Sequence, residues 1–261
     1  MGVAQPVNAG FDPVRVTNER GASPFVIICD HASNNVPAPY ETLGLDPRDL
    51  QRHIAWDPGA LPVAGRLARS LDAALVESRV SRLIVDCNRP LDAPDLIAAV
   101  SETTAVPGNA GIALEERARR IALAYDPFHA AIDGLVSQRI AEGRPAWLVS
   151  IHSFTPVYKG VARPWQIGII HDDDRRLADP MIAALESRPG LTVGRNQPYS
   201  PADRVYFTLE RHARSRRLPC AMIEIRNDEI AADAGQKHWA DLLADIMTHV
   251  QRSGVPAMES S

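Results

Sequence analysis

Cysteine is scarce in this chain. The 261 residues include three cysteines, Cys29, Cys87 and Cys220, each within or at the end of a predicted buried strand. Cysteines in such places usually pack as small apolar residues, and an odd number of them does not form a disulfide framework. The cysteine content therefore favours a reducing compartment.

Long apolar runs and an excess of positive charge are also missing. Nowhere do about 18 consecutive apolar residues occur, the length that a membrane-spanning helix needs. Residues 1–18 lack the basic and apolar segments of a signal peptide. The net charge of −4, with both signs interspersed, offers no basic stripe for a polyanion. We therefore expect a cytoplasmic protein without nucleic-acid or membrane partners, and the oligomeric state stays open.

Apolar runs and helical periodicities alternate along the chain, which is long enough to bury a large core. Predicted strands occupy residues 25–29, 83–85, 147–151, 166–170, 191–193 and 221–225. Predicted helices occupy residues 58–75, 114–142, 175–187, 203–217 and 233–250. The alternation predicts one domain over residues 1–261, a three-layer α/β/α arrangement around a mostly parallel mixed sheet, with short flexible ends.

Two segments interrupt this pattern. Proline disfavours helix at the residue before it and lacks a donor, so Asp126-Pro127 predicts either two helices or one kinked helix. Residues 91–112 show no sustained periodicity and predict a long loop. Loops of this length in compact domains are usually functional, so we place this one over the site.

Polar side chains follow or lie within several predicted strands. His31 follows the first strand, Asn88-Arg89 the second and His152 the third, and Glu224 lies within the last. The carboxyl ends of parallel strands meet at one edge of an open sheet. Two imidazoles, an arginine and a carboxylate would then share one crevice, which predicts metal-assisted hydrolysis.

Each of these residues also has a simpler interpretation. A histidine at a strand end is often a hydrogen-bonded structural residue. Glu224 could form an ion pair with Arg226 on the same strand face. Arg89 could lie at the surface with its guanidinium in solvent. Asp57 precedes a predicted helix that begins with Pro58, so helix capping is its default role. It is also a candidate metal ligand, because two histidines leave a zinc site one protein ligand short of the usual three.

The remaining polar clusters are expected to be structural. The run Asp172-Asp173-Asp174 predicts a solvated turn that caps the next helix. We expect the other histidines on the surface or on helix faces: His53, His129, His171, His212, His238 and His249.

Seven segments in one chain order, from about residue 25 to 250, carry a resemblance. They are Asp30-His31-Ala32-Ser33-Asn34, His53-Ile54-Ala55-Trp56-Asp57, Asp86-Cys87-Asn88-Arg89, Ile151-His152-Ser153, Arg163-Pro164-Trp165, Asn196-Gln197-Pro198-Tyr199-Ser200 and Glu224-Ile225-Arg226-Asn227-Asp228. Together they resemble the N-formylglutamate amidohydrolase family. The His-Ser, Asn-Arg and Glu-Ile-Arg parts also resemble, more distantly, the zinc carboxypeptidases.

The resemblance implies a phosphorylase/hydrolase-like fold and one divalent metal, zinc, that serves cleavage of the C–N bond of an N-acyl amino acid. His31 and His152 match the histidine ligands, Glu224 matches the catalytic glutamate, and Asn88 and Arg89 match the substrate-binding pair. The implied reaction converts N-formyl-L-glutamate to formate and glutamate, a step of histidine degradation.

One position departs from the carboxypeptidase pattern. Carboxypeptidases have a glutamate three residues after the first histidine, where this chain has Asn34, a neutral and weaker ligand. Either Asp57 completes the site, or the metal is held less tightly, or this member has lost activity.

The mechanism expected from these residues is hydrolytic. Zinc held by His31, His152 and Asp57 would activate a water, and Glu224 would take its proton. We assign Arg89 to catalysis as well as to binding. The residues expected to bind the carboxylated substrate are Asn88, Arg89, Arg163, Tyr199 and Arg226.

Two other classes of function stay open. Cys29 or Cys87 could act as a nucleophile, with His31 or His152 as its base. Alternatively, Asn34 could mark a non-catalytic relative that binds a carboxylated ligand without turning it over.

Overall fold

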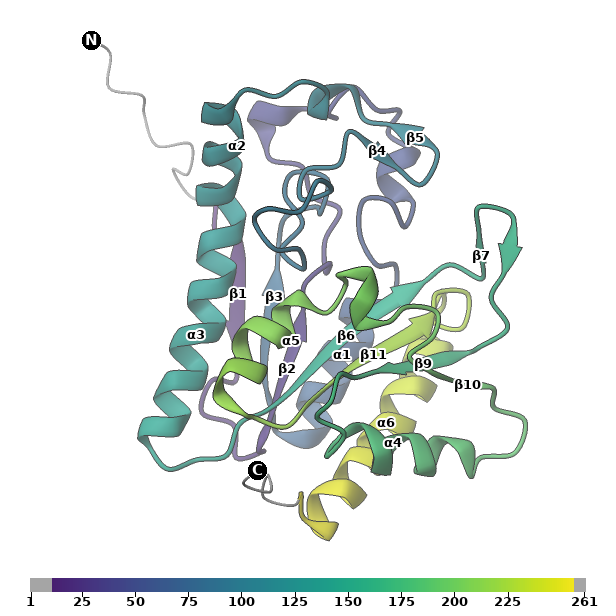
Figure 1. The fold of residues 1–261 in the computed structure, drawn as a ribbon. Coiled ribbons are helices and arrows are strands. Elements are labelled where there is room, and N and C mark those ends of the chain that lie inside the picture. Colours follow the sequence, from purple (N-terminus) through teal and green to yellow (C-terminus); the bar gives the residue numbers. More distant parts are fainter. Residues whose placement is uncertain (1–10, 256–261) are drawn as a thin grey trace.

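The computed structural model of the chain describes residues 11–255 (Figure 1), and the flexible ends expected from the sequence lie outside this range. Its central sheet has seven strands in the order β1-β3-β2-β6-β11-β9-β10. Their bounds are β1 Val14–Thr17, β2 Phe25–Cys29, β3 Ala74–Ser78, β6 Trp147–Phe154, β9 Ile167–Ile170, β10 Val193–Arg195 and β11 Cys220–Arg226. Strands β3, β2, β6 and β11 are parallel, whereas β1 and β9 are antiparallel to their inner neighbours. The sheet is therefore mixed and mostly parallel.

Helices cover both faces of this sheet. Their bounds are α1 Ala60–Leu71, α2 Leu114–Arg120, α3 Asp126–Ala141, α4 Ala178–Glu186, α5 Phe207–His212 and α6 Asp233–Ser253. Helices α1, α4 and α6 share one apolar cluster with Phe25 and Ile27 of β2, and α3 and α5 share another with Val26 and Ile28. Successive strand residues face opposite sides, so an all-apolar strand such as β2 fits a sheet buried on both faces. These clusters confirm the three-layer α/β/α prediction.

Shorter elements complete the chain. Two small hairpins pair β4 Val100–Ser101 with β5 Thr104–Ala105 and β7 Val157–Tyr158 with β8 Val161–Ala162. Single 3₁₀ turns lie at Ala38–Tyr40, Asp49–Gln51, Pro107–Asn109, Pro201–Asp203 and Arg214–Arg216. The predicted long loop therefore contains the β4–β5 hairpin and one 3₁₀ turn. Within residues 11–255, no helix has the length and apolar character needed to cross a membrane.

The strand predicted at residues 83–85 is wrong. Leu83, Ile84 and Val85 are buried in a third apolar cluster beneath irregular segments, so their apolar character reports burial rather than strand structure. The strand beside β2 is β3, which the prediction assigned in part to a helix. Helix α1 ends earlier, at Leu71, and β3 begins at Ala74.

The helical segments also differ from the prediction in detail. Between α2 and α3, residues Ile121–Tyr125 form a π-turn, and the Asp126 N–H donates to the Ile121 carbonyl. One continuous helical run thus passes through Pro127 instead of breaking there (Figure 1). The helix predicted over residues 203–217 is only α5 flanked by 3₁₀ turns.

Candidate active site

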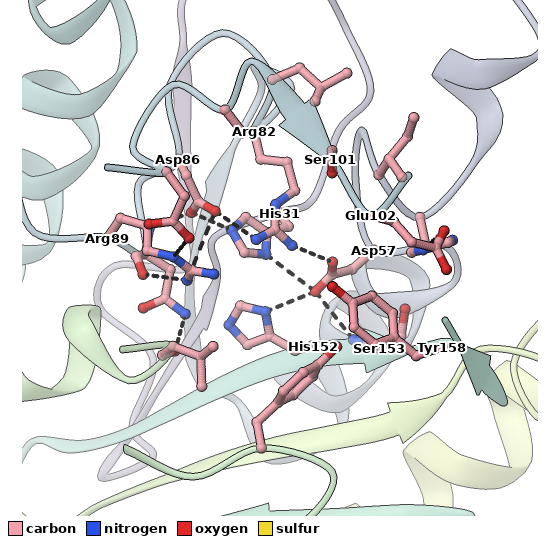
Figure 2. A pocket seen from close by; sticks show the side chains of 18 of the residues that line it. His31, Asp57, Arg82, Asp86, Arg89, Ser101, Glu102, His152, Ser153 and Tyr158 are labelled. Carbon is pink, nitrogen blue, oxygen red and sulfur yellow. Dashed lines mark hydrogen bonds and ion pairs between the residues drawn. The ribbon is translucent and has the colours of Figure 1, made fainter. Parts of the chain in front are cut away.

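A cavity of about 210 Å³ opens at the carboxyl ends of β2, β6 and β11 (Figure 2). Most of the residues singled out from the sequence line it: His31, Asp57, Asn88, Arg89, His152, Tyr199 and Glu224. The strand ends thus supply two imidazoles and a carboxylate to one crevice, as the parallel topology predicts.

His31, Asp57 and His152 form a buried group at the base of this cavity. Their ligand atoms all lie within 4.8 Å of one another, close enough to share a metal ion. Asp57 Oδ2 lies 2.8 Å from His152 Nδ1 and 3.4 Å from His31 Nδ1. The backbone fixes this arrangement, because the Asp57 N–H donates to the His31 carbonyl and the Ser153 N–H donates to Asp57 Oδ2.

Asp57 does not cap the helix that follows it. Gly59, in the left-handed region at φ 82°, occupies the position before α1, and no side chain caps the helix. A Cβ at Gly59 would lie 2.5 Å from the Ile230 carbonyl oxygen, so only glycine fits this turn. Asn34, in contrast, donates its Nδ2 to the Leu50 carbonyl and does not line the cavity. Asp57 therefore takes the third place beside the two histidines.

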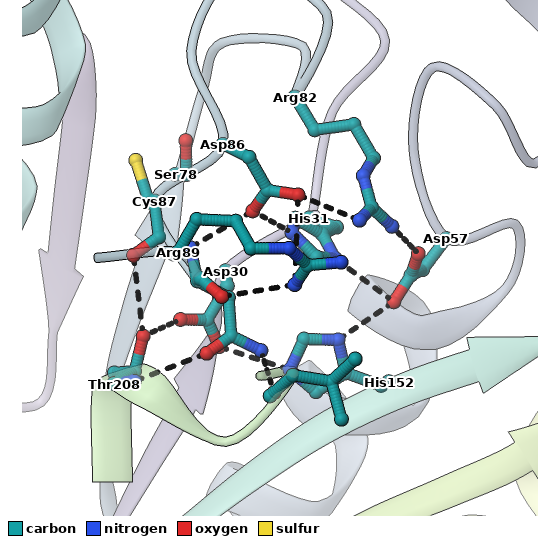
Figure 3. Close-up of polar contacts among 12 residues, drawn as sticks. Asp30, His31, Asp57, Ser78, Arg82, Asp86, Cys87, Arg89, His152 and Thr208 are labelled. Atoms are coloured by element: carbon teal, nitrogen blue, oxygen red, sulfur yellow. Dashed lines mark hydrogen bonds and ion pairs between the residues drawn. The ribbon is translucent and has the colours of Figure 1, made fainter. Parts of the chain in front are cut away.

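Carboxylates hold the outer nitrogen of each histidine (Figure 3). His31 Nε2 donates to Asp86 Oδ1 at 2.7 Å, and His152 Nε2 donates to Asp30 Oδ2 at 3.1 Å. Ser150 and Thr208 donate to Asp30 in turn. Histidines that bind a metal usually donate their other N–H to a carboxylate or carbonyl, which fixes the tautomer and the ring.

The donor set fits one divalent cation. His31 Nδ1 is buried and has no hydrogen-bond partner among the described residues, and such an atom calls for an explanation. Burial opposes ionisation of Asp57, but the charge of His31 and the hydrogen bond with His152 hold its pKa well below the usual range. Two imidazole nitrogens and one carboxylate match the three protein ligands of catalytic zinc sites. His31, Asp57 and His152 would hold the ion.

Glu224 lies beside this group on β11. It is opposite His152 of β6 in the parallel register, it is 4% exposed, and its Oε2 has no partner among the described residues. Burial, helped by the charge of Asp57 and opposed by His152, raises the pKa of Glu224 to about 7. The alternative in which Glu224 pairs with Arg226 is not supported, because the Arg226 guanidinium instead binds two later carboxylates, Asp228 and Glu229.

Tyr199 lines the cavity from a loop that crosses β9. Gly168 of β9 lies opposite Glu224 in the register, and a Cβ there would lie 1.9 Å from the Gln197 carbonyl oxygen. The missing side chain therefore lets this loop pass directly over the strand. Arg163 donates to the Tyr199 hydroxyl at 3.0 Å, and its guanidinium lies 4.6 Å from the ring centroids of both Tyr199 and Tyr158.

Two arginines predicted to bind substrate lie outside the cavity lining, Arg163 behind the tyrosines and Arg226 among its own acidic partners. Asn88 lines the cavity, but its side chain accepts from the Thr208 N–H and donates to the Val205 carbonyl. Of the predicted binding group, Arg89 is the cation that reaches the cavity.

The sequence interpretation missed Arg82. Its guanidinium lines the cavity, 2.6 Å from Asp86 Oδ2 and 3.6 Å from Asp57 Oδ1. Burial opposes the charge of Arg82, but Asp86 and Asp57 raise its pKa above the ordinary value. Arg82 lies just before residues 83–85, where the sequence predicts a strand. The only sequence signal for the Arg82–Asp86 ion pair is their spacing of four residues.

Of the histidines expected on the surface or on helix faces, His53 departs from the expectation, whereas His129 and His212 lie on faces of α3 and α5. His53 lines the cavity with Nε2 3.2 Å from Glu102 Oε2. His129 and His212 are buried and joined at 2.8 Å. In the acidic run Asp172-Asp173-Asp174, Asp172 forms an ion pair with Arg214 at 3.3 Å.

The cysteines are poorly placed for nucleophilic catalysis. Cys29 is 0% and Cys87 2% exposed, and neither lines the cavity. Burial raises the pKa of both thiols well above the ordinary value. Because the thiolate is the nucleophile, the geometry gives the cysteine alternative no support.

The fold and the cavity define an α/β protein in which a buried His-Asp-His group, suited to one cation, adjoins a buried carboxylate whose Oε2 has no partner among residues 11–255. A family model for N-formylglutamate amidohydrolase matches residues 23–231. The chain belongs to this family. Because amidohydrolases are hydrolases, membership supports a hydrolase activity for this protein.

Two solved structures share the fold of this chain. Gene product Atu2144 from Agrobacterium tumefaciens is 44% identical with a TM-score of 0.91, over 94% of this chain and 97% of that one. The N-formylglutamate amidohydrolase from Ralstonia eutropha JMP134 is 21% identical with a TM-score of 0.71, over 93% and 99% of the two chains, and so shares the fold. A search of curated proteins gave no match.

Proposed function

We propose that this protein is a zinc-dependent amidohydrolase that cleaves the amide C–N bond of an N-formyl amino acid, with N-formyl-L-glutamate as substrate. One observation carries the proposal. The candidate ligands His31, Asp57 and His152 share a small cavity with the buried carboxylate of Glu224 and with the arginine Arg89.

Glu224 is the general base of the proposed reaction. A bound divalent cation would supply a Lewis acid for the scissile carbonyl and would acidify a nearby water. Glu224 is buried beside this site, where its carboxylate can take a proton from water and return it to the leaving amine. Its position beside His152 brings this carboxylate to the candidate cation site.

Arg89 binds a carboxylate of the substrate in this proposal. Arg82 and Arg89 are the arginines lining the cavity in the described part of the chain, and Arg82 already bridges Asp86 and Asp57. Arg89 also has partners, since its Nε pairs with the half-exposed Asp95 at 2.8 Å and its Nη1 donates to the Asn88 carbonyl. Its Nη2 has no hydrogen-bond partner within residues 11–255, so Arg89 is better placed than Arg82 to bind a substrate carboxylate, a group that a guanidinium can hold with two hydrogen bonds. Tyr199 accepts from Arg163, so its own proton is available to a second polar group of the substrate. The small cavity favours an acyl amino acid over a polypeptide.

The test pairs metal content with turnover. Elemental mass spectrometry of the purified protein is expected to give about one zinc per chain, as a mononuclear catalytic site requires. Formate release from N-formyl-L-glutamate is expected to stop after chelation and to return when zinc is added. Full turnover by metal-free protein would contradict the metal dependence. Zinc-dependent turnover of N-acetyl but not N-formyl amino acids would instead contradict the substrate.

A further inference from the structure

The turn that carries Arg89 is held by side chains from another element. Residues 86–89 form no strand, and buried carbonyls outside regular structure must find other donors. The Tyr125 hydroxyl donates to the Arg89 carbonyl at 3.1 Å, and His129 Nε2 donates to the Cys87 carbonyl at 3.0 Å. These two bonds lie on either side of Asn88. Thr208 reaches the Cys87 carbonyl more weakly, at 3.5 Å (Figure 3).

Both donors project from the long helical run. Tyr125 is the last residue of the π-turn Ile121–Tyr125, and His129 follows four residues later in α3. Residues four apart lie on one helix face. A π-turn inserts one extra residue, which rotates the residues before it relative to those after it, and such turns are frequent at functional sites. This π-turn joins α2 to the part of the helix whose face meets residues 87–89.

The donor atoms are well defined. Tyr125 is 0% and His129 1% exposed, so no water competes for these bonds. His129 Nδ1 lies 2.8 Å from His212 Nε2. Since His129 Nε2 donates to a carbonyl, its Nδ1 accepts from His212, which fixes the tautomer of a neutral ring. The direction of each bond follows from the geometry.

We propose that Tyr125 and His129 are positioning residues for substrate binding: by holding the carbonyls on both sides of Asn88, they set the direction in which Arg89 enters the cavity. The inference rests on the proposed function for the role of Arg89 as a carboxylate-binding group. Neither donor lines the cavity, so both act through Arg89.

Tyr125→Phe tests the inference because it removes the hydroxyl and keeps the ring. The KM for N-formyl-L-glutamate is expected to rise about tenfold, equivalent to about 1.4 kcal/mol, with kcat within about threefold of the wild type and zinc content unchanged. Tyr206→Phe is the matched control, since Tyr206 is also buried and its hydroxyl contacts Cys220 Sγ. Its KM is expected to stay at the wild-type value.

His129 offers a second pair of variants. His129→Leu removes the donor, whereas His129→Gln keeps an N–H that can reach the Cys87 carbonyl. The leucine variant is expected to raise KM as Tyr125→Phe does. The glutamine variant is expected to have a KM close to the wild-type value. A loss of folding in the leucine variant would leave Tyr125→Phe to decide.

Crystal structures of the same variants give a readout that needs no turnover. In Tyr125→Phe, the turn at residues 87–89 is expected to shift and Arg89 to lose its 2.8 Å contact with Asp95. An unchanged Arg89 together with an unchanged KM would overturn the inference. If the wild type does not hydrolyse N-formyl-L-glutamate, the proposed function fails, and the position of Arg89 alone decides this inference.

Discussion

Glu224 and His152 are directly opposite each other on neighbouring parallel strands, β11 and β6. The hydrogen bonds of the sheet, rather than a loop, therefore set the distance from the candidate base to a candidate ligand. Side chains at paired positions point to the same face of a sheet. The two groups thus reach the cavity together.

Replacing Glu224 by glutamine should abolish turnover and keep the metal. The amide has nearly the same shape but cannot take a proton, so kcat is expected to fall by about 10²–10⁴-fold. Formate release and elemental mass spectrometry measure the two effects. Glu229→Gln, a change in a carboxylate that pairs with Arg226, is the control. Turnover above a tenth of the wild type in Glu224→Gln would contradict the base assignment.

Replacing Asp30 by asparagine should weaken the metal site without removing a ligand. Asp30 holds the Nε2 of His152, and loss of such an outer partner typically costs about 10–100-fold in metal affinity or activity. Competition with a chelating indicator measures the zinc affinity. The exposed Asp133, which pairs with Arg216, provides the control Asp133→Asn. Equal zinc affinity and activity in Asp30→Asn and wild type would show that Asp30 does not support the ligand.

Removal of both candidate nucleophilic thiols should leave catalysis intact. Cys29 and Cys87 are buried outside the cavity lining, so Cys29→Ala, Cys87→Ala protein is expected to keep kcat within about threefold of the wild type, the spread of context-dependent mutational effects. Thermal unfolding serves as a check that the variant is folded. A large loss of kcat in folded, zinc-loaded protein would revive the cysteine mechanism.

Acid should destabilise the protein through the His129–His212 pair. Burial lowers the pKa of His129 to about 3 and that of His212 to about 4, whereas an unfolded histidine has a pKa of about 6.5. Between these pKa values the unfolded protein binds more protons than the folded protein. The contribution of the two neutral histidines to the free energy of unfolding is therefore complete above pH 6.5 and declines as the pH falls toward 4.

Urea unfolding of metal-free protein between pH 7.5 and 4.5 measures this effect. The stability of wild type relative to His212→Gln is expected to fall with decreasing pH, by at most about 1.4 kcal/mol per pH unit for one group. A difference that is constant across this range would contradict the burial of a neutral histidine.

The sequence predicted the inner part of the fold and the main chemical groups. Strands β2 and β9 are wholly apolar and β6 and β11 mostly so, and a strand buried on both faces has this pattern. Because three of them are parallel neighbours, the placement of His31, His152 and Glu224 followed from topology alone.

The rest depends on contacts between distant residues. Strand β3 escaped recognition because it ends in Glu77-Ser78, and buried Glu77 is balanced by Arg15 on β1. The roles of Asp30 and Arg82 depend on their partners in the folded structure, His152 for Asp30 and Asp86 for Arg82. No local pattern in a sequence reports such pairs.

The β6–β11 register also bears on how such a protein can change over time. Glu224 and His152 share one rung of the β6–β11 ladder, while Ser101, Tyr158 and Tyr199, which line the cavity, come from hairpins and a loop. Substitutions in these segments would change the shape of the cavity without disturbing the ladder. Proteins descended from one ancestral gene could thus come to bind different molecules while keeping the same pair of strands.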